Sequence, residues 1–139
     1  MNESKIQAYA KRFERVFVYI DEHLGEPMSV EQLSKVAHFS KFHFHRQFSQ
    51  YAGIGVTAYV LQVRLRRSAY QLVFSQKRII DVAVEACFES PEAFGRAFRH
   101  TFGQPPSQFR KSPKWQPWNE RIKLPPRTRN EKMNVSINE

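Results

Sequence analysis

A fourteen-residue pattern occurs twice in this chain, fifty residues apart, and this internal repeat constrains the fold more than any other feature. The first copy spans residues 40–53 and the second spans residues 90–103. The residues shared by the two copies are Ser40 and Ser90, Phe44 and Phe94, Arg46 and Arg96, Phe48 and Phe98, and Gly53 and Gly103. A repeat at fixed spacing indicates one supersecondary unit that is used twice.

Each copy has the pattern of a helix with its own start and stop signals. The two Phe residues of a copy are four positions apart, so both rings fall on one helical face, and the Arg between them points elsewhere. Ser40 and Ser90 suit the N-cap, Pro91 suits the first helical position, and Gly53 and Gly103 suit a left-handed C-terminal residue. We therefore expect one helix over residues 41–52 and another from Pro91 to the residue before Gly103.

A shorter apolar-periodic stretch precedes each of these helices. The first lies near residues 30–37, where Ser29 and Gln32 form a capping box, and the second contains Ile79, Val82, Ala83 and Ala86. About four residues, around His38-Phe39 and Cys87-Phe88, separate each short stretch from its long helix. Two helices joined by such a turn make a helix-turn-helix, and here the motif is predicted twice.

Three further helices are expected around these units. The helix over residues 5–24 has an apolar stripe of Ile6, Tyr9, Phe13, Val16, Phe17, Ile20 and Leu24. The helix over residues 56–74 has an apolar side, in which Ala58, Leu61, Leu65, Ala69 and Leu72 recur at helical spacing and are joined by Tyr59, Val63, Tyr70 and Val73. A short closing helix begins at Pro105-Pro106, with Phe109 as the counterpart of Tyr59. The predicted fold is all-α, with about seven helices and two helix-turn-helix subdomains joined by a long central helix.

The length of the central helix is close to the spacing of major grooves along one face of a DNA duplex. Its nineteen residues span about 28 Å at 1.5 Å per residue. Successive major grooves on one face of a duplex lie about 34 Å apart. A rod of that length could hold two reading helices in adjacent grooves.

Composition shifts near residue 111, so we expect one domain over residues 1–111 and a Pro-rich basic linker over residues 112–139. The segment 133–137 alternates polar and apolar residues like an opening strand that has no partner. We expect a further C-terminal domain to follow it in a longer parent protein.

The charge distribution indicates a polyanionic partner. The net charge is +9 and the pI is about 10.0, and no Asp or Glu occurs from Gln32 through Ile80. A surface free of carboxylates suits contact with phosphates, although a basic face without a partner is the alternative. The chain has one cysteine, no long apolar run and no signal peptide, so we expect a cytoplasmic protein without disulfide or membrane span.

The outer faces of the two long helices differ. In the first, Phe42, His45, Arg46 and Ser49 face away from the apolar stripe of Phe44, Phe48 and Tyr51. An exposed Phe beside an exposed Arg fits contact with a thymine methyl next to a guanine, whereas Phe42 could instead lie under a neighbouring loop. In the second helix, the small residues Ala93 and Gly95 permit close approach either to a DNA groove or to another helix.

Over residues 8–111 the sequence resembles the AraC/XylS family of transcription regulators. The second unit carries the family pattern in Val82-Ala83, Cys87-Phe88, Ser90, Phe94-Gly95-Arg96-Ala97-Phe98, Gly103, Pro106 and Phe109-Arg110. The first unit and the joining helix match in Leu33, Ser40, Phe44, Arg46, Phe48, Gly53, Tyr59, Arg64, Ala69 and Leu72. Departures are His38 and Cys87 in place of the turn glycine and Val56 in place of a proline. Glu92 would be unfavourable near phosphates unless it accepts a hydrogen bond from a cytosine amine.

The resemblance implies a sequence-specific regulator of the bacterial nucleoid, an activator, that binds asymmetric sites on double-stranded DNA and contacts RNA polymerase. The base-reading residues would be Phe42, His45, Arg46, Pro91, Glu92, Ala93, Gly95 and Arg96. We expect phosphate contacts from Ser40, Lys41, Ser49, Arg64, Arg66, Arg67, Ser90 and Arg99. The fragment should be a monomer without a cofactor. A hydrophobic or cationic effector would bind only through a gyrase-inhibitor-like C-terminal domain that lies beyond these residues.

Other classes of function fit the sequence less well. His43 and His45 diverge on a helix, and neither a phosphate-binding glycine loop nor a carboxylate pair is present, so we expect no catalytic or metal site. A helical protein that binds RNA or DNA without sequence preference is the alternative function. A protein-binding helical module would leave the carboxylate-free stretch unexplained.

Overall fold

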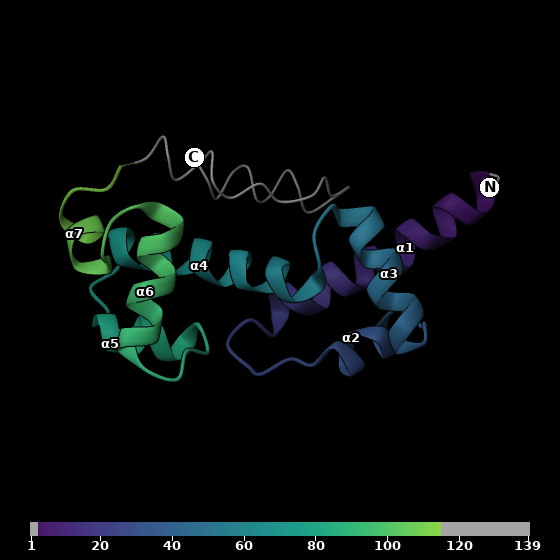
Figure 1. Ribbon diagram of the computed structural model, residues 1–139, viewed down its shortest axis with the longest axis horizontal. Coiled ribbons are helices and arrows are strands. Elements are labelled where there is room, and N and C mark those ends of the chain that lie inside the picture. Colours follow the sequence, from purple (N-terminus) through teal and green to yellow (C-terminus); the bar gives the residue numbers. More distant parts are fainter. Residues whose placement is uncertain (1–2, 115–139) are drawn as a thin grey trace. The chain divides into compact units, whose positions relative to one another are not determined.

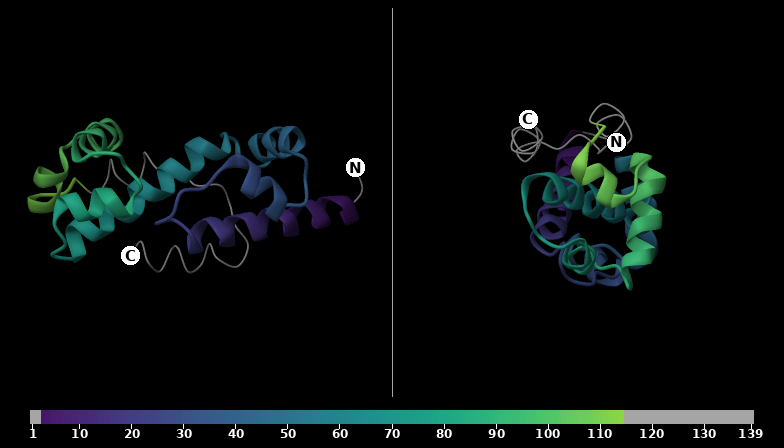
Figure 2. Two further views of the ribbon diagram at one scale, coloured as in Figure 1. Left: turned by 90° about the horizontal axis from the view of Figure 1, so that it is seen from below. Right: turned by 90° about the vertical axis from the view of Figure 1, so that its left-hand side faces the viewer.

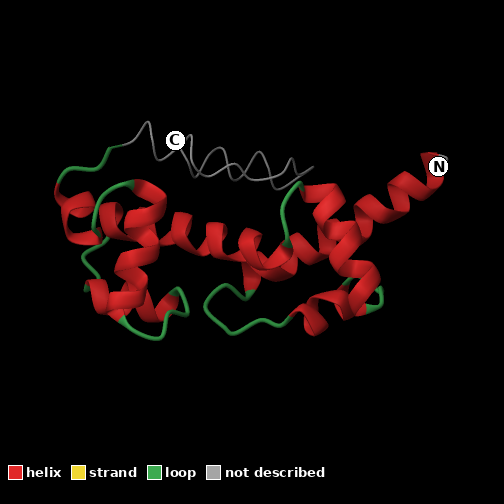
Figure 3. Cartoon of the chain, viewed as in Figure 1, coloured by secondary structure: helices red, strands yellow, loops and turns green. Residues whose placement is uncertain are grey.

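The computed structural model describes residues 3–114, and within that range every regular element is a helix (Figure 1, Figure 3). The helices are α1 (Glu3–Glu22), α2 (Val30–Val36), α3 (Lys41–Ala52), α4 (Val56–Phe74), α5 (Ile79–Glu85), α6 (Pro91–Phe102) and α7 (Pro106–Lys111). The all-α prediction with seven helices is confirmed. The bounds expected for α3, α4 and α6 are also correct, whereas α1 begins and ends two residues earlier than expected. The predicted linker beyond Lys114 lies outside the described residues.

The described residues divide into two compact units. Unit 1 holds residues 3–22 and 28–57, and unit 2 holds residues 23–27 and 58–114. Each unit therefore contains one helix-turn-helix, α2–α3 in unit 1 and α5–α6 in unit 2. The short segment 23–27 follows α1 in sequence but belongs to unit 2.

Unit 1 is held together by aromatic packing between α1 and α3. The Phe48 ring lies 6.0 Å from Phe13 and 5.7 Å from Phe17, centroid to centroid, and all three side chains are buried. Tyr51 stacks on Phe13 at 4.7 Å but remains 39% exposed, so the prediction that it is buried with Phe44 and Phe48 holds only in part. Ring contacts of this kind add to the stabilisation from apolar burial.

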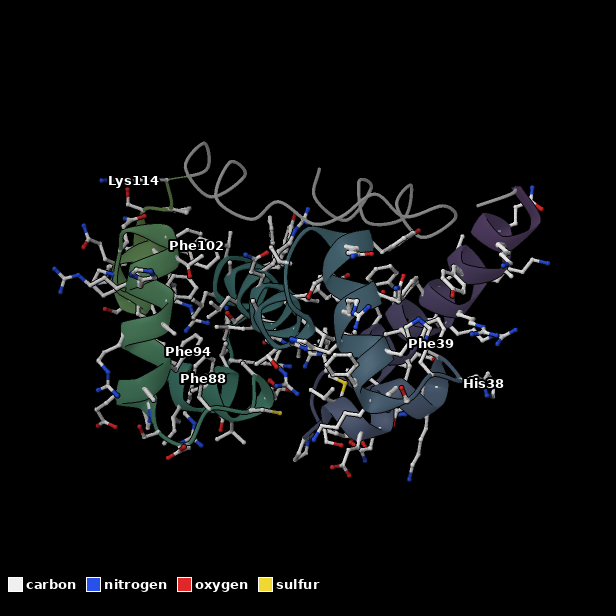
Figure 4. All side chains as sticks on the ribbon, turned by 45° about the vertical axis from the view of Figure 1, so that its right-hand side comes forward. His38, Phe39, Phe88, Phe94, Phe102 and Lys114 are labelled. Carbon is white, nitrogen blue, oxygen red and sulfur yellow. The ribbon has the colours of Figure 1, made fainter. Side chains whose placement is uncertain are left out.

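Unit 2 has its own core beneath α6. Phe98 contacts Phe102 at 4.4 Å and Phe109 at 5.1 Å, centroid to centroid, and all three rings are buried. The core also contains Leu65, Ala69, Leu72, Val82, Ala83 and Phe94. In Figure 4 the labelled Phe94 and Phe102 point from α6 toward this core, which leaves the opposite face of α6 outward.

Both helix-turn-helix turns have the same backbone structure. In the first, the N–H of His38 donates to the carbonyl of Lys35, and the N–H of Phe39 donates to the carbonyl of Ser34. In the second, Cys87 and Phe88 donate in the same way to Val84 and Ala83. This pair of bonds is the Schellman motif, which requires a left-handed residue after the helix.

The left-handed residues are His38, at φ 60°, and Cys87, at φ 64°. They are the two positions at which the sequence replaces the turn glycine, and the backbone conformation has been retained in both. The second turn contains one additional residue, Glu89, before its N-cap. α5 and α6 meet at this turn (Figure 2).

The helix α4 buries different faces along its length. Leu65, Ala69 and Leu72 are buried as expected. Ala58 and Leu61 are exposed, with 41% of Leu61 accessible, so their assignment to the same stripe is wrong. In the first half of the helix the buried residues are Tyr59 and Val63, which were expected on the apolar side, together with residues 56 and 60. At 100° per residue these positions lie on nearly the opposite side from residues 65, 69 and 72, so no single stripe describes α4.

Candidate nucleic-acid interface

The outer face of α3 presents an aromatic ring together with a cation. The Phe42 side chain is 71% exposed, so the alternative in which it lies under a loop is wrong. The Arg46 guanidinium carbon lies 4.9 Å from the centroid of the Phe42 ring, which is a cation–π contact. Lys41 and His45 are also exposed on α3. This face therefore combines apolar surface with hydrogen-bond donors.

Local sequence signals and core packing set the orientation of α3. The Ser40 hydroxyl oxygen accepts a hydrogen bond from the backbone N–H of His43 at 3.2 Å, as an N-cap does. Gly53 ends the helix in the left-handed conformation, at φ 80°. Because Phe44 and Phe48 are fully buried, Phe42 and Arg46 are directed to solvent.

The same signals position α6. The Ser90 hydroxyl oxygen accepts from the backbone N–H of Ala93 at 3.1 Å, and Pro91 begins the helix. The exposed residues of α6 are Pro91, Glu92, Arg96, Arg99 and His100. Glu92 and Arg96 are one turn apart, yet no ion pair joins them, so both charged groups are available to a ligand.

The small residues of α6, Ala93 and Gly95, could allow close approach either to a DNA groove or to another helix, and the structure distinguishes these two roles for Gly95. A Cβ atom built on Gly95 meets no neighbouring atom within 4 Å. Close packing against another described helix therefore does not account for this glycine. Ala93 is half-buried.

Arg64 has an internal role. Its Nε donates to the Leu24 carbonyl at 3.1 Å and its Nη2 donates to the Glu26 carbonyl at 2.7 Å. These bonds fasten segment 23–27 to α4 within unit 2. Two of the five guanidinium N–H donors are thereby used within unit 2, and the expected phosphate contact of Arg64 stays a prediction.

Arg66 is a half-buried cation on α4. Burial lowers the pKa of its guanidinium, and the Tyr70 hydroxyl, which hydrogen-bonds to it, acts in the opposite direction. Burial likewise raises the pKa of Tyr70, and Arg66 partly offsets that increase. No described carboxylate forms an ion pair with Arg66, so its charge is not neutralised locally. Arg67 is also partly buried on α4.

Acidic residues just outside the carboxylate-free stretch neutralise some of its cations. Glu31 pairs with Lys41 at 3.4 Å, Glu85 pairs with Lys77 at 3.0 Å, and Asp81 pairs with Arg78 at 2.9 Å. The hydrogen bond to Asp81 raises the pKa of Arg78. Exposed pairs of this kind are weak and screened by salt. Breaking such an ion pair to form a phosphate contact would therefore cost little free energy.

Arg12 makes an aromatic contact that no sequence pattern predicts. Arg12 on α1 lies over the ring of Phe39, in the first turn, with its guanidinium carbon 4.7 Å from the centroid. The same carbon is 5.8 Å from the Tyr9 centroid. The contact joins residues far apart in sequence, so neither periodicity nor composition signals it.

The described part of the chain shows neither a metal site nor a membrane-spanning helix. No three His, Cys, Asp or Glu side chains gather there as a metal site requires. None of the helices there has the length and apolar character needed to cross a membrane.

Two helix-turn-helix units, each with an exposed face on its second helix, define a helix-turn-helix DNA-binding domain. Residues 33–112 match the family described as "Helix-turn-helix domain". A transcriptional regulator of Bacillus subtilis, YbfP, which is described as uncharacterized, is 40% identical over 102 residues, covering 73% of this chain and 35% of its own. The right origin-binding protein of Escherichia coli K12 is 34% identical over 100 residues, covering 72% and 35%.

A solved structure agrees with these relatives. The DNA-binding domain of AdpA, described as a global transcriptional factor in complex with a target DNA, superposes with a TM-score of 0.66. It is 29% identical in sequence, and the match covers 70% of this chain and 87% of that one.

The chain therefore belongs to the AraC/XylS family of helix-turn-helix transcription regulators. It spans about a third of the length of the two curated relatives given above.

Proposed function

We propose that this chain is the part of a transcription regulator that recognises a specific sequence of double-stranded DNA, with α3 and α6 each placed in a major groove. The observation that carries the proposal is the exposed Phe42–Arg46 pair on the second helix of a helix-turn-helix. A guanidinium reads guanine through O6 and N7, and an apolar ring contacts a thymine methyl. Arg46 and Phe42 therefore have the chemistry to read a guanine beside a thymine.

The base-contacting set has two parts. In unit 1 it is Phe42, His45 and Arg46, and in unit 2 it is Pro91, Glu92, Ala93, Gly95 and Arg96. Phosphates would be held by Ser40, Lys41, Ser49, Arg64, Arg66, Arg67, Ser90 and Arg99. The exposed charges of Lys41 and Arg99 support this assignment, as does Arg66, which forms no ion pair with a described carboxylate.

The wider role follows from the family and is part of the same proposal. The chain would act as an activator in the bacterial cytoplasm, contact RNA polymerase, and bind DNA as a monomer. An effector would act through another part of a longer protein. The AdpA domain was crystallised in complex with a target DNA, which supports the choice of DNA as the ligand.

The test is selection of bound duplexes from a random library at about 0.15 M salt, where non-specific phosphate binding is weakened. Two enriched blocks about 10 base pairs apart are expected for two helices in successive major grooves. The variant Arg46→Ala should lose the preference within one block. Salt-sensitive binding without any enriched sequence would overturn specific recognition and favour a protein that binds nucleic acid without sequence preference.

A further inference from the structure

Position 95 differs sharply from its counterpart in the repeat. Gly95 aligns with His45, because the two copies are offset by fifty residues, and His45 is exposed on α3. The two positions occupy the same place on their helices, four residues after the N1 residues Lys41 and Pro91. One recognition helix therefore carries an imidazole where the other carries no side chain.

Neither the backbone conformation nor the packing among the described residues explains this glycine. Gly53 and Gly103 have positive φ angles, but Gly95 lies inside a helix and is not among the positive-φ glycines. An added Cβ would meet open space. Glycine inside a helix destabilises it relative to alanine because its unfolded backbone is more flexible. The fold of the described residues would therefore be more stable with alanine at this position.

The surroundings of Gly95 are those of the candidate interface. On a helix, residues three and four positions away are surface neighbours, and for Gly95 these include Glu92 and Arg99, both exposed. Arg96 follows directly, is exposed, and forms no ion pair with a described residue. Glycine is the residue used where a backbone approaches a ligand closely.

We infer that the backbone of α6 approaches the DNA closely at Gly95, so that the two recognition helices lie at different depths against the duplex. On α3, long side chains reach the bases from a greater distance. On α6, no side chain at Gly95 holds the helix away from the duplex. Glu92 and the Cβ–Cγ part of Arg96 can therefore contact the groove. The inference rests on the proposed function, because the approaching surface is taken to be a DNA duplex.

The experiment compares Gly95→Ala and Gly95→Leu with the wild-type chain on two duplexes. The first duplex carries the whole selected site, and the second is the same duplex with one block replaced. The replaced block is the one whose preference Arg46→Ala leaves intact, since that block belongs to α6. Affinity is measured by fluorescence anisotropy, and folding is measured by thermal denaturation.

Gly95→Ala should raise the Tm by about 3 °C, because a helical glycine has been removed. It should nevertheless weaken the affinity for the whole site about tenfold, which is the size of effect expected when one good contact is lost. Gly95→Leu should weaken binding further, and neither variant should differ from wild type on the duplex with the replaced block. Ser107→Ala, at an exposed position of α7, is the matched control and should leave both affinities unchanged.

Unchanged affinity of Gly95→Ala for the whole site would overturn the inference and leave the proposed function standing. Equal losses on both duplexes would also overturn it, because the effect would not depend on the block that α6 reads. A wild-type chain that prefers no sequence would instead overturn the proposed function together with this inference.

Discussion

The guanidinium carbon of Arg46 lies 4.9 Å from the centroid of the Phe42 ring, one helical turn away on the exposed face of α3. A ring that is 71% exposed gains little from burial, so the fold of unit 1 does not require it. The cation–π contact instead favours the rotamers of Arg46 that place its guanidinium over the ring. A guanidinium that is already held in position loses less conformational entropy when it binds a guanine.

Replacing Arg46 with alanine should remove discrimination at one base pair. The expected loss is about 1 to 3 kcal/mol for the preferred base, with little change for other bases. The measurement is the affinity for duplexes that differ at single positions of the selected site. Arg66→Ala is the contrasting variant, since a phosphate contact should weaken all duplexes alike and reduce the salt slope by about one. Equal weakening of every sequence by Arg46→Ala would contradict its assignment to base reading.

Phe42→Ala should separate binding from folding. The free energy of unfolding should change by no more than about 0.5 kcal/mol, as is usual for a surface position, while affinity for sites with thymine beside the guanine should fall. Phe44→Ala is the matched control because its ring is fully buried. It should cost about 3 to 5 kcal/mol of stability. A large loss of stability with Phe42→Ala would show that the ring belongs to the core of unit 1.

Arg64→Ala should destabilise unit 2 without affecting base preference. The guanidinium donates to the Leu24 and Glu26 carbonyls, and losing hydrogen bonds from a charged group should cost about 1 to 3 kcal/mol. Urea denaturation measures this loss, and DNA affinity is measured under conditions where the variant is folded. Normal stability would show that these hydrogen bonds contribute little, and a reduced salt slope would support a phosphate contact from Arg64.

The repeat made most of the fold predictable. Its Ser and Gly residues mark helix ends, and the caps at Ser40, Ser90, Gly53 and Gly103 have the expected geometry. The turns were placed correctly because both follow an apolar-periodic stretch of similar length. These features depend on residues close together in sequence, where propensity and capping act directly.

The errors concern contacts between distant residues. No sequence pattern signals the hydrogen bonds of Arg64, because the carbonyls that it binds lie about forty residues earlier. The stripe of α4 was misassigned at Leu61 because the helix changes its buried face midway. The Arg12–Phe39 contact was missed for the same reason, since it forms only when α1 packs beside the turn. The base contacts remain predictions.

The two leucines of α4 test its change of face. Leu65 is buried, so Leu65→Ala should cost about 2 to 5 kcal/mol through the cavity it leaves. Leu61→Ala removes the same atoms from a side chain that is 41% exposed, and it should cost less than about 1 kcal/mol. Chemical denaturation of both variants gives the comparison. Similar losses would mean that α4 buries one continuous stripe, as the sequence pattern first predicted.

His38 tests whether the left-handed turn carries conformational strain. Its φ of 60° is favourable for glycine and unfavourable for a residue with a Cβ atom. His38 is exposed, so replacing it should remove few contacts. His38→Gly should therefore raise the free energy of unfolding by about 0.5 to 1 kcal/mol. His38→Val should lower it by about 1 kcal/mol or more, because a β-branched side chain is poorly tolerated at positive φ. Thermal denaturation of the pair measures both effects, and a decrease in stability with glycine would show that the imidazole contributes a contact that outweighs the backbone strain.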